Sequence, residues 1–318
     1  MLYTDYFRSE PDETWDFAVQ CGVTHGTIRL PEDENFDVCD ESQLRFVVDR
    51  FVEHGITPVV VEPLPNSLHD HIKLGDEKRD ESIGKFIKLM ENLSKNGITT
   101  VCFNFMAHYG WTRTHTLTDR GGATVTGFSL DKFNEKNRDD DFAIDENTLR
   151  GNYGYFIKAA IPYAEKYGIK LALHPDDPPL DSLGSVGRIF TSLDAVVRGI
   201  NVVKSENLGV TFCQACYRLM GEELENAIST LSDKIFFVHF RNVYGTKRDF
   251  RETFHDNGEI DMKRTIGFYK KYCKNGAAEI PIRVDHVPTY REESIENAGY
   301  DSLGRLFALG YLKGLLEE

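Results

Sequence analysis

The sequence predicts a soluble (β/α)8 barrel, in which eight parallel strands form a closed sheet surrounded by helices. Eight short runs rich in β-branched and aromatic residues supply the number of strands that this fold requires. Helical patterns lie between several of these runs. Four of the helical patterns end in glycine and lead straight into a strand, so one helix-to-strand junction is repeated along the chain.

The expected strands are distributed over the whole chain, and each is followed by polar residues or glycine. They are residues 2–7, 24–30, 57–64, 99–105, 170–175, 208–213, 234–240 and 280–286. The 318 residues, 41% of them hydrophobic, can bury the core of one large barrel or of two ordinary domains. No linker rich in Pro, Gly or Ser divides the chain, so we expect a single barrel domain over residues 1–318.

The expected helices end with the sequences HGI, NGI, YGI and LGV. They cover residues 41–55, 81–97, 149–168 and 193–209. This alternation excludes an all-α or all-β fold. An open, doubly wound sheet is the structural alternative, although no glycine-rich phosphate-binding turn follows the first strand. The acidic segment 131–148 is expected to form a long solvated loop over the barrel mouth.

Charge and composition exclude several classes of protein. A net charge of −14 disfavours nucleic acid or an anionic membrane as a partner, because both require a basic surface. The chain has no run of eighteen apolar residues, and its first residues lack the pattern of a signal peptide, so we expect a cytoplasmic protein. The widely spaced cysteines are expected to be free thiols. They are Cys21, Cys39, Cys102, Cys213, Cys216 and Cys273.

Four consecutive predicted strands, the fifth to the eighth, each end in a good metal ligand. These residues are His174, Cys213, His239 and Asp285. Because the carboxyl ends of barrel strands converge on the barrel axis, we expect the four side chains to meet. Two imidazoles, a thiolate and a carboxylate suit a borderline divalent ion such as Mn²⁺, Fe²⁺, Co²⁺ or Zn²⁺.

Each of these residues also has a structural interpretation, since a single buried histidine or cysteine usually belongs to the core. The occurrence of four ligands on successive strand ends favours a metal site. Cys213 and Cys216 also form a lone CxxC motif, which is typical of a redox pair or of half a zinc ribbon. With no second CxxC and no thioredoxin-like context, we favour Cys213 as a ligand of the shared site.

The chain resembles the mannonate dehydratase family at several short motifs. These are HPDDPP (174–179), TFCQ (211–214), FVHFRN (237–242), the ETFH and GEIDM segments (252–262) and RVDH (283–286). Further blocks of the family are similar to VEPLP with HIKLGDEKRD (61–80), NLSKNGITTVCFNFM (92–106), WTRT (111–114) and GYDSLGRLFALGYLKGL (299–315). The resemblance covers most of the chain in the same order, which makes it more specific than any single motif.

This resemblance implies a xylose-isomerase-like barrel that dehydrates D-mannonate to 2-keto-3-deoxy-D-gluconate with Mn²⁺. The four expected ligands fall on the family's metal positions, and His286 and Tyr300 are implied as acid and base. The chain departs from the family pattern in RVDHVPTY and TFCQACY, and it is shorter around residues 243–258, which should form part of the lid. A related sugar acid is therefore an alternative substrate.

The implied reaction explains the residue types. Dehydration of an aldonate removes a proton next to the carboxylate and expels the neighbouring hydroxyl, and both steps build up negative charge. A metal stabilises that charge as a Lewis acid, while an acid protonates the departing oxygen. His286 and Tyr300 are suited to the proton transfers, although the sequence does not assign the acid and the base between them.

Five further residues are candidates for contacts with the substrate. Arg113 and Arg241 present planar guanidinium groups that match a carboxylate, or form structural ion pairs. His69 and His108, beyond the third and fourth strands, are candidates to contact hydroxyl groups, or are ordinary loop residues. Glu62 is expected to bind a hydroxyl or to orient a basic neighbour.

Three other residues near the expected site have open roles. Asp176 and Asp177 follow ligand His174 and either orient imidazoles or cap the following turn. Trp111 is expected either to wall the pocket or to fill the packing between barrel and loop.

Two other functions remain open at this point. A sugar isomerase or epimerase on the same barrel needs the same metal and proton-transfer groups. A non-catalytic sugar-acid sensor would retain the pocket and the metal without the chemistry. A small-molecule sugar acid is the expected partner in each case, and because barrels of this type often associate, we allow for a homo-oligomer.

Overall fold

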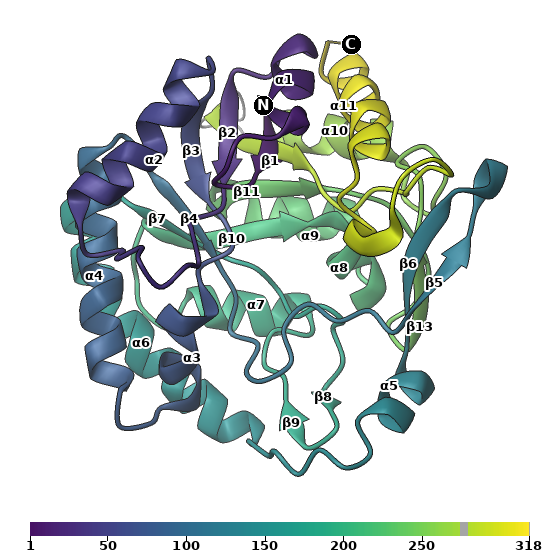
Figure 1. The fold of residues 1–318 in the computed structure, drawn as a ribbon. Coiled ribbons are helices and arrows are strands. Elements are labelled where there is room, and N and C mark those ends of the chain that lie inside the picture. Colours follow the sequence, from purple (N-terminus) through teal and green to yellow (C-terminus); the bar gives the residue numbers. More distant parts are fainter. Residues whose placement is uncertain (274–278, 318) are drawn as a thin grey trace.

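Eight parallel strands of the computed structural model close into a barrel, which confirms the predicted fold class (Figure 1). The strands are β1 (Leu2–Phe7), β2 (His25–Ile28), β3 (Thr57–Val61), β4 (Thr100–Phe103), β7 (Lys170–Leu173), β10 (Leu208–Cys213), β11 (Ile235–Phe240) and β14 (Pro281–Val284). The structure describes residues 1–273 and 279–317. Each strand pairs with the next along the chain, and β14 closes the barrel by pairing with β1. All eight lie within the ranges that the sequence predicts.

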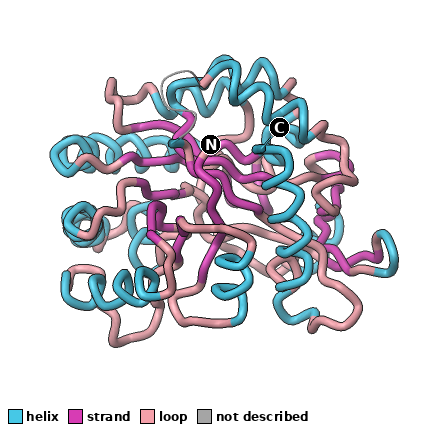
Figure 2. The backbone as a smooth tube through the Cα atoms, turned by 90° about the horizontal axis from the view of Figure 1, so that it is seen from above, coloured by secondary structure: helices cyan, strands magenta, loops and turns pink. Residues whose placement is uncertain are grey.

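Helices surround this barrel, and a view turned by 90° shows the strands at the centre of the molecule with helices outside them (Figure 2). They are α1 (Glu13–Gln20), α2 (Glu41–Glu53), α3 (Asn66–Leu74), α4 (Arg79–Lys95), α6 (Glu146–Tyr167), α7 (Leu193–Ile200), α8 (Gln214–Met220), α9 (Leu224–Leu231), α10 (Met262–Tyr272) and α11 (Ser302–Glu317). Gly55, Gly97 and Gly168 follow α2, α4 and α6 with φ of 79°, 77° and 68°. These left-handed residues end the helices as the sequence predicts.

The fourth predicted junction is wrong, because α7 ends at Ile200 and does not reach Gly209. Gly209 lies inside strand β10, and a Cβ atom at this position would lie 2.3 Å from the carbonyl oxygen of Lys234. The glycine is therefore required by the close approach of two backbones rather than by a helix end.

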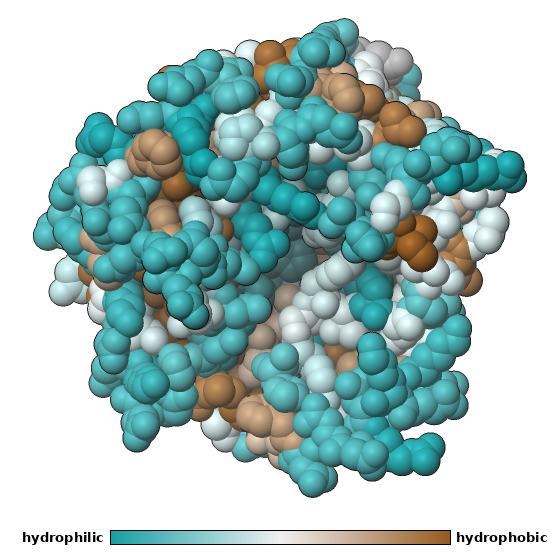
Figure 3. Space-filling model, viewed as in Figure 1, coloured by the Kyte–Doolittle hydropathy of each residue, from teal (hydrophilic) through white to brown (hydrophobic). Residues whose placement is uncertain are grey.

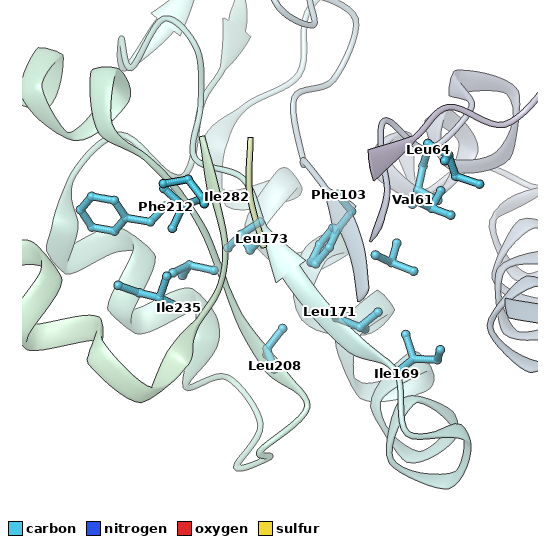
Figure 4. Close-up of a cluster of buried hydrophobic side chains, with 14 of the residues drawn as sticks. Val61, Leu64, Phe103, Ile169, Leu171, Leu173, Leu208, Phe212, Ile235 and Ile282 are labelled. Carbon is cyan, nitrogen blue, oxygen red and sulfur yellow. The ribbon is translucent and has the colours of Figure 1, made fainter. Parts of the chain in front are cut away.

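Apolar side chains fill the space between the barrel and the helices. Figure 4 shows part of this core, in which Val61, Leu171, Leu173, Phe212 and Ile282 come from four different barrel strands and are fully buried. Burial of each such side chain contributes about 1.5–3 kcal/mol to the free energy of folding. The core therefore fixes the strands and leaves their carboxyl ends free to carry polar groups.

A second, four-stranded antiparallel sheet was not predicted. Its strands are β5 (His115–Thr118), β6 (Thr124–Ser129), β12 (Val243–Thr246) and β13 (Asp249–Glu252), in the order β12-β13-β6-β5. The hairpin of β5 and β6 projects from the right-hand side of the molecule in Figure 1. Part of the segment 243–258, which was expected to belong to a lid, thus forms a sheet with β6.

The acidic segment 131–148 is not one long loop as expected. Helix α5 (Leu130–Lys136) occupies its beginning, and α6 starts at Glu146. A short hairpin of β8 (Ser182–Leu183) and β9 (Val186–Gly187) lies farther along the chain. Within the described residues, no helix combines the length and apolarity needed to cross a membrane.

Gly209→Ala should destabilise the protein by about 1–3 kcal/mol, because the added methyl group would collide with the Lys234 carbonyl oxygen in a well-packed barrel. Gly151→Ala is the matched control. Gly151 lies inside α6 with no atom near a built Cβ, so alanine there should stabilise the protein by about 0.5–1 kcal/mol. Urea unfolding of both variants measures the difference, and equal midpoints would contradict this account.

Candidate metal centre and active site

The barrel register brings the four predicted metal ligands to one rim. Cys213 is the last residue of β10 and pairs with His239 of β11. His239 in turn pairs with Arg283 of β14, and Asp285 follows at the end of that strand. His174 directly follows β7. Four neighbouring strands therefore deliver one donor each to the same end of the barrel.

The donor atoms are close enough to share one ion. His174 Nε2 lies 3.2 Å from His239 Nδ1, and His239 Nδ1 lies 3.6 Å from Asp285 Oδ2. The donor atoms of Cys213, His239 and Asp285 all lie within 4.8 Å of one another. Ligands at 2.0–2.3 Å from one metal are separated by up to roughly 4.6 Å, so the set needs little adjustment to bind an ion.

The two imidazole rings give a direct test of whether a cation fits. His174 Nδ1 lies 2.6 Å from the carbonyl oxygen of Pro175, which only accepts, so this nitrogen carries the hydrogen. His239 Nε2 lies 2.8 Å from the carboxylate oxygen Glu62 Oε1, an ion-pair contact on the side of the ring that faces away from His174. His174 Nε2 therefore carries a lone pair, and it lies 3.2 Å from His239 Nδ1. A cation between these two nitrogens would be held by imidazoles whose outer nitrogens contact a carbonyl and a carboxylate, an arrangement that orients histidine ligands in metal sites.

Acidic groups make this position attractive to a positive charge. Burial and Arg283 disfavour protonation of His239, but Glu62 and Asp285 outweigh them and raise the pKa of His239 to about 9. Glu62 Oε2 also accepts a hydrogen bond of 2.8 Å from Arg283 Nε, so its carboxylate is held between the arginine and the histidine. Glu62 therefore orients a basic neighbour, which is one of the two roles that the sequence allows.

Arg113 and Arg241 lie in a buried network of ion pairs and outside the residues that line the cavity. Arg113 contacts Asp177 at 2.8 Å and Glu252 at 2.5 Å, and Arg241 contacts the same two carboxylates at 2.5 and 2.6 Å. All four side chains are at most 5% exposed. The geometry thus does not favour the expected clamp on the substrate, because both guanidinium groups already face internal carboxylates.

Arg241 also contacts the candidate metal ligands. Its Nε atom lies 3.3 Å from Cys213 Sγ and 3.1 Å from Asp285 Oδ2. Burial opposes ionisation of Cys213, but a hydrogen bond from Cys216 and the charge of Arg241 hold the pKa of Cys213 well below its usual value. Arg241 therefore stabilises the anionic form of two ligands at once.

His286 and Tyr300 form a hydrogen-bonded pair beside the ligands. His286 Nε2 lies 3.1 Å from the Tyr300 hydroxyl, and its other nitrogen lies 2.7 Å from Arg241 Nη1 and 3.1 Å from Glu252 Oε1. Burial, followed by the charge of Asp285, raises the pKa of Tyr300, so its hydroxyl stays protonated. These contacts hold the imidazole in place and direct Nε2 toward the tyrosine.

The pair and several ligands line a cavity of about 490 Å³, on the face that is hollowed near its centre in Figure 3. Glu62, His108 and Trp111 also line it, and the Trp111 ring centroid lies 4.6 Å from that of His286. His69 is buried outside this lining, and its Nδ1 lies 3.0 Å from the Pro65 carbonyl oxygen.

The two aspartates after His174 have different roles. Asp177 lines the cavity and accepts hydrogen bonds from both buried arginines. Asp176 accepts hydrogen bonds from the backbone N–H groups of Ile189 and Phe190, so it organises the loop that follows.

Sequence reasoning missed several cationic residues of the cavity lining, which are Arg8, Arg29, Lys73 and Arg283. Arg283 could have been predicted to face the site, because residues two apart on a strand share a face and the candidate ligand Asp285 lies two positions later. Lys73 lies in the HIKLG block but carries no recognisable motif of its own. Burial lowers the pKa of Lys73 to about 8.

Residues 14–143 and 129–318 match the sequence profile of the D-mannonate dehydratase family. A mannonate dehydratase of Streptococcus agalactiae serotype III (strain NEM316) is 32% identical over 314 residues, which cover 88% of this chain and 87% of that protein. A mannonate dehydratase of Oceanobacillus iheyensis is 31% identical over 310 residues, with 88% and 86% covered.

Solved structures agree with these sequence matches. The crystal structure of mannonate dehydratase from Streptococcus suis serotype 2 superposes with a TM-score of 0.88 at 26% identity, covering 100% of this chain and 94% of that one. A D-psicose 3-epimerase from Clostridium cellulolyticum H10 superposes with a TM-score of 0.65 at 14% identity, a likeness that concerns the fold alone.

Arg241→Met should destabilise the protein by about 3–5 kcal/mol, because the substitution leaves Asp177 and Glu252 as poorly compensated buried charges. Arg120→Met is the matched control, since its pair with Asp256 is largely exposed and should contribute less than about 1 kcal/mol. Chemical denaturation compares the two variants. Similar losses for both would show that the buried network is not a special determinant of stability.

Cys213→Ala should weaken binding of a divalent ion by more than about 100-fold, because loss of an outer-shell partner alone typically costs about 10–100-fold. Cys39→Ala, a substitution in the loop before α2, should bind the ion as the unchanged chain does. Calorimetric titration of chelator-treated protein measures both affinities. Equal affinities would remove Cys213 from the ligand set.

Proposed function

The chain belongs to the D-mannonate dehydratase family, and from this premise we propose that it is a metal-dependent hydro-lyase that converts D-mannonate to 2-keto-3-deoxy-D-gluconate and water. One observation carries the proposal beyond family membership. Three of the four candidate metal donors and the histidine–tyrosine pair line one cavity of a size suited to a small sugar acid, and the fourth donor, Cys213, lies directly behind them.

We propose His174, Cys213, His239 and Asp285 as the residues that hold the metal. Mn²⁺ is the ion that the family resemblance implies, and Fe²⁺, Co²⁺ and Zn²⁺ also suit this mixture of nitrogen, sulfur and oxygen donors. When bound, the ion supplies positive charge that stabilises the negative charge developing on the substrate's carboxylate side.

Tyr300 is the proposed acid and His286 the proposed base. The raised pKa of Tyr300 keeps a proton available for the departing hydroxyl, and the imidazole is suited to take the proton from the carbon next to the carboxylate. Dehydration consumes no net proton, so a pair in direct contact can pass one proton from carbon to oxygen and return to its starting state. Glu252 and Arg241, both within 3.1 Å of the outer imidazole nitrogen, hold the ring in position during this exchange.

Other cations of the cavity are the better candidates for recognising the anionic substrate. Arg113 and Arg241 are committed to internal carboxylates, whereas Arg8, Arg29 and Lys73 face the cavity. Lys73 is 3% exposed, and its ammonium nitrogen lies 3.3 Å from Asp70 Oδ1. An ammonium group in this position retains donors for a carboxylate or hydroxyl of the sugar acid.

Metal-loaded protein incubated with D-mannonate should release a 2-keto-3-deoxy acid whose mass is lower than that of the substrate by one water. An isomerase or epimerase would conserve the mass, and a sensor would leave the substrate unchanged. Mass spectrometry of the reaction separates these outcomes. Failure with a broad panel of aldonates would overturn the lyase proposal.

Tyr300→Phe and His286→Gln should each lower kcat by about 100-fold to 10,000-fold, the usual contribution of a positioned acid or base. Both variants should keep the four donors and bind the metal with little change. Steady-state kinetics and metal titration on the same preparations provide the two readouts. An unchanged kcat in either variant would remove that residue from the mechanism.

A further inference from the structure

Cys216 is a buried thiol that the proposed reaction does not use. Cys213 is the N-cap residue of α8, and Cys216 lies on the first turn of the same helix. Both side chains are fully buried, and both are free cysteines. The sulfur atoms lie within 4.8 Å of each other and of a ring nitrogen of His174. The Cys216 sulfur therefore lies next to Cys213, the proposed metal ligand, at the start of α8.

One guanidinium group contacts both sulfur atoms. Arg241 Nε lies 3.3 Å from Cys213 Sγ, and Arg241 Nη2 lies 3.4 Å from Cys216 Sγ. The guanidinium group therefore lies beside both sulfur atoms and holds the two side chains in one place. The CxxC motif thus brings two free thiols within reach of each other at the start of one helix.

The cavity brings small solutes next to the neighbours of Cys213. Three residues around Cys213, namely His174, His239 and Asp285, line the open cavity. Hydrogen peroxide is little larger than water and is small enough to enter this cavity of about 490 Å³. A metal bound to Cys213 would occupy the same sulfur and block the attack.

We propose that Cys213 and Cys216 form a reversible disulfide when the metal-free protein meets hydrogen peroxide, and that this bond removes Cys213 from the metal site. The inference rests on the proposed role of Cys213 as a ligand. Metal and oxidant then compete for one sulfur atom, so the CxxC motif makes metal loading sensitive to oxidation.

The chemistry balances with peroxide as the oxidant. The Cys213 sulfur attacks one peroxide oxygen, an S–O bond forms, the O–O bond breaks and the other oxygen leaves as water, which gives a sulfenic acid. The Cys216 sulfur then attacks the Cys213 sulfur, the S–S bond forms, and the S–O bond breaks as the hydroxyl leaves as water with the Cys216 proton. The two thiols lose two electrons, and peroxide is reduced to two waters.

The test treats the full-length chain with peroxide after chelator treatment and, in parallel, after loading with Mn²⁺. In the metal-free sample the number of titratable thiols should fall by two, and peptide mass mapping should locate the disulfide between Cys213 and Cys216. Uptake of Mn²⁺ should fall more than about 10-fold and recover with dithiothreitol, since the bond removes a ligand. The Mn²⁺-loaded sample should keep its thiols.

Two variants provide matched controls. Cys216→Ser keeps the size of the side chain but removes the partner thiol, so peroxide should produce no disulfide at Cys213 in this variant. Cys273→Ser, at a buried position outside the site, should form the disulfide as the unchanged chain does.

The readouts separate this inference from the proposed reaction. The inference would be overturned if peptide mapping finds no disulfide between Cys213 and Cys216, or if the disulfide forms and Mn²⁺ uptake does not change. Both results come from the chain without substitutions, so they do not depend on the folding of a variant. If the disulfide forms and Mn²⁺ uptake is lost while D-mannonate is not dehydrated, the inference stands and the lyase proposal fails.

Discussion

The buried guanidinium group of Arg241 both stabilises the site and sets the charge of its candidate ligands. It contacts the carboxylates of Asp177 and Glu252, which fix its position, and it lies 3.1–3.3 Å from Asp285 and Cys213 and 2.7 Å from the His286 ring. A permanent positive charge in this place keeps two candidate ligands anionic and holds the imidazole. The residue is better described as positioning the site than as contacting the substrate.

The barrel supplies the other constraint. Parallel register places Cys213 opposite His239 and brings Asp285 to the same rim, so residues from distant parts of the sequence meet without a dedicated loop. The apolar core outside the strands holds this register, and the polar groups at the rim carry the chemistry. This separation is why one fold supports dehydratases and epimerases alike, and why the side chains at the rim, more than the barrel itself, determine the reaction.

Much of the fold, and the meeting of the four candidate ligands at one rim, is local in the sequence and was predictable. Short stretches of sequence are enough to recognise the strand patterns and helix caps such as Gly55. The symmetry of the barrel then brings the ends of the four strands that carry the candidate ligands to one rim. The sheet containing β6 and β13 was missed because it pairs segments more than one hundred residues apart. The sequence left a structural ion pair open for Arg113 but could not identify its partners for the same reason, since Asp177 and Glu252 come from different loops and strands. Gly209 was wrongly predicted to end a helix, because a glycine required by strand packing looks the same in the sequence as a glycine that ends a helix.

The proposed reaction depends on four donor atoms that share one cation, and X-ray diffraction tests this arrangement most directly. Crystals soaked with Mn²⁺ should give one strong anomalous peak within about 2.0–2.3 Å of a nitrogen of His174 and of His239, the sulfur of Cys213 and an oxygen of Asp285. A peak surrounded by other residues would contradict the proposed site. The absence of a peak at this rim, in crystals that hold Mn²⁺ elsewhere, would contradict it as well.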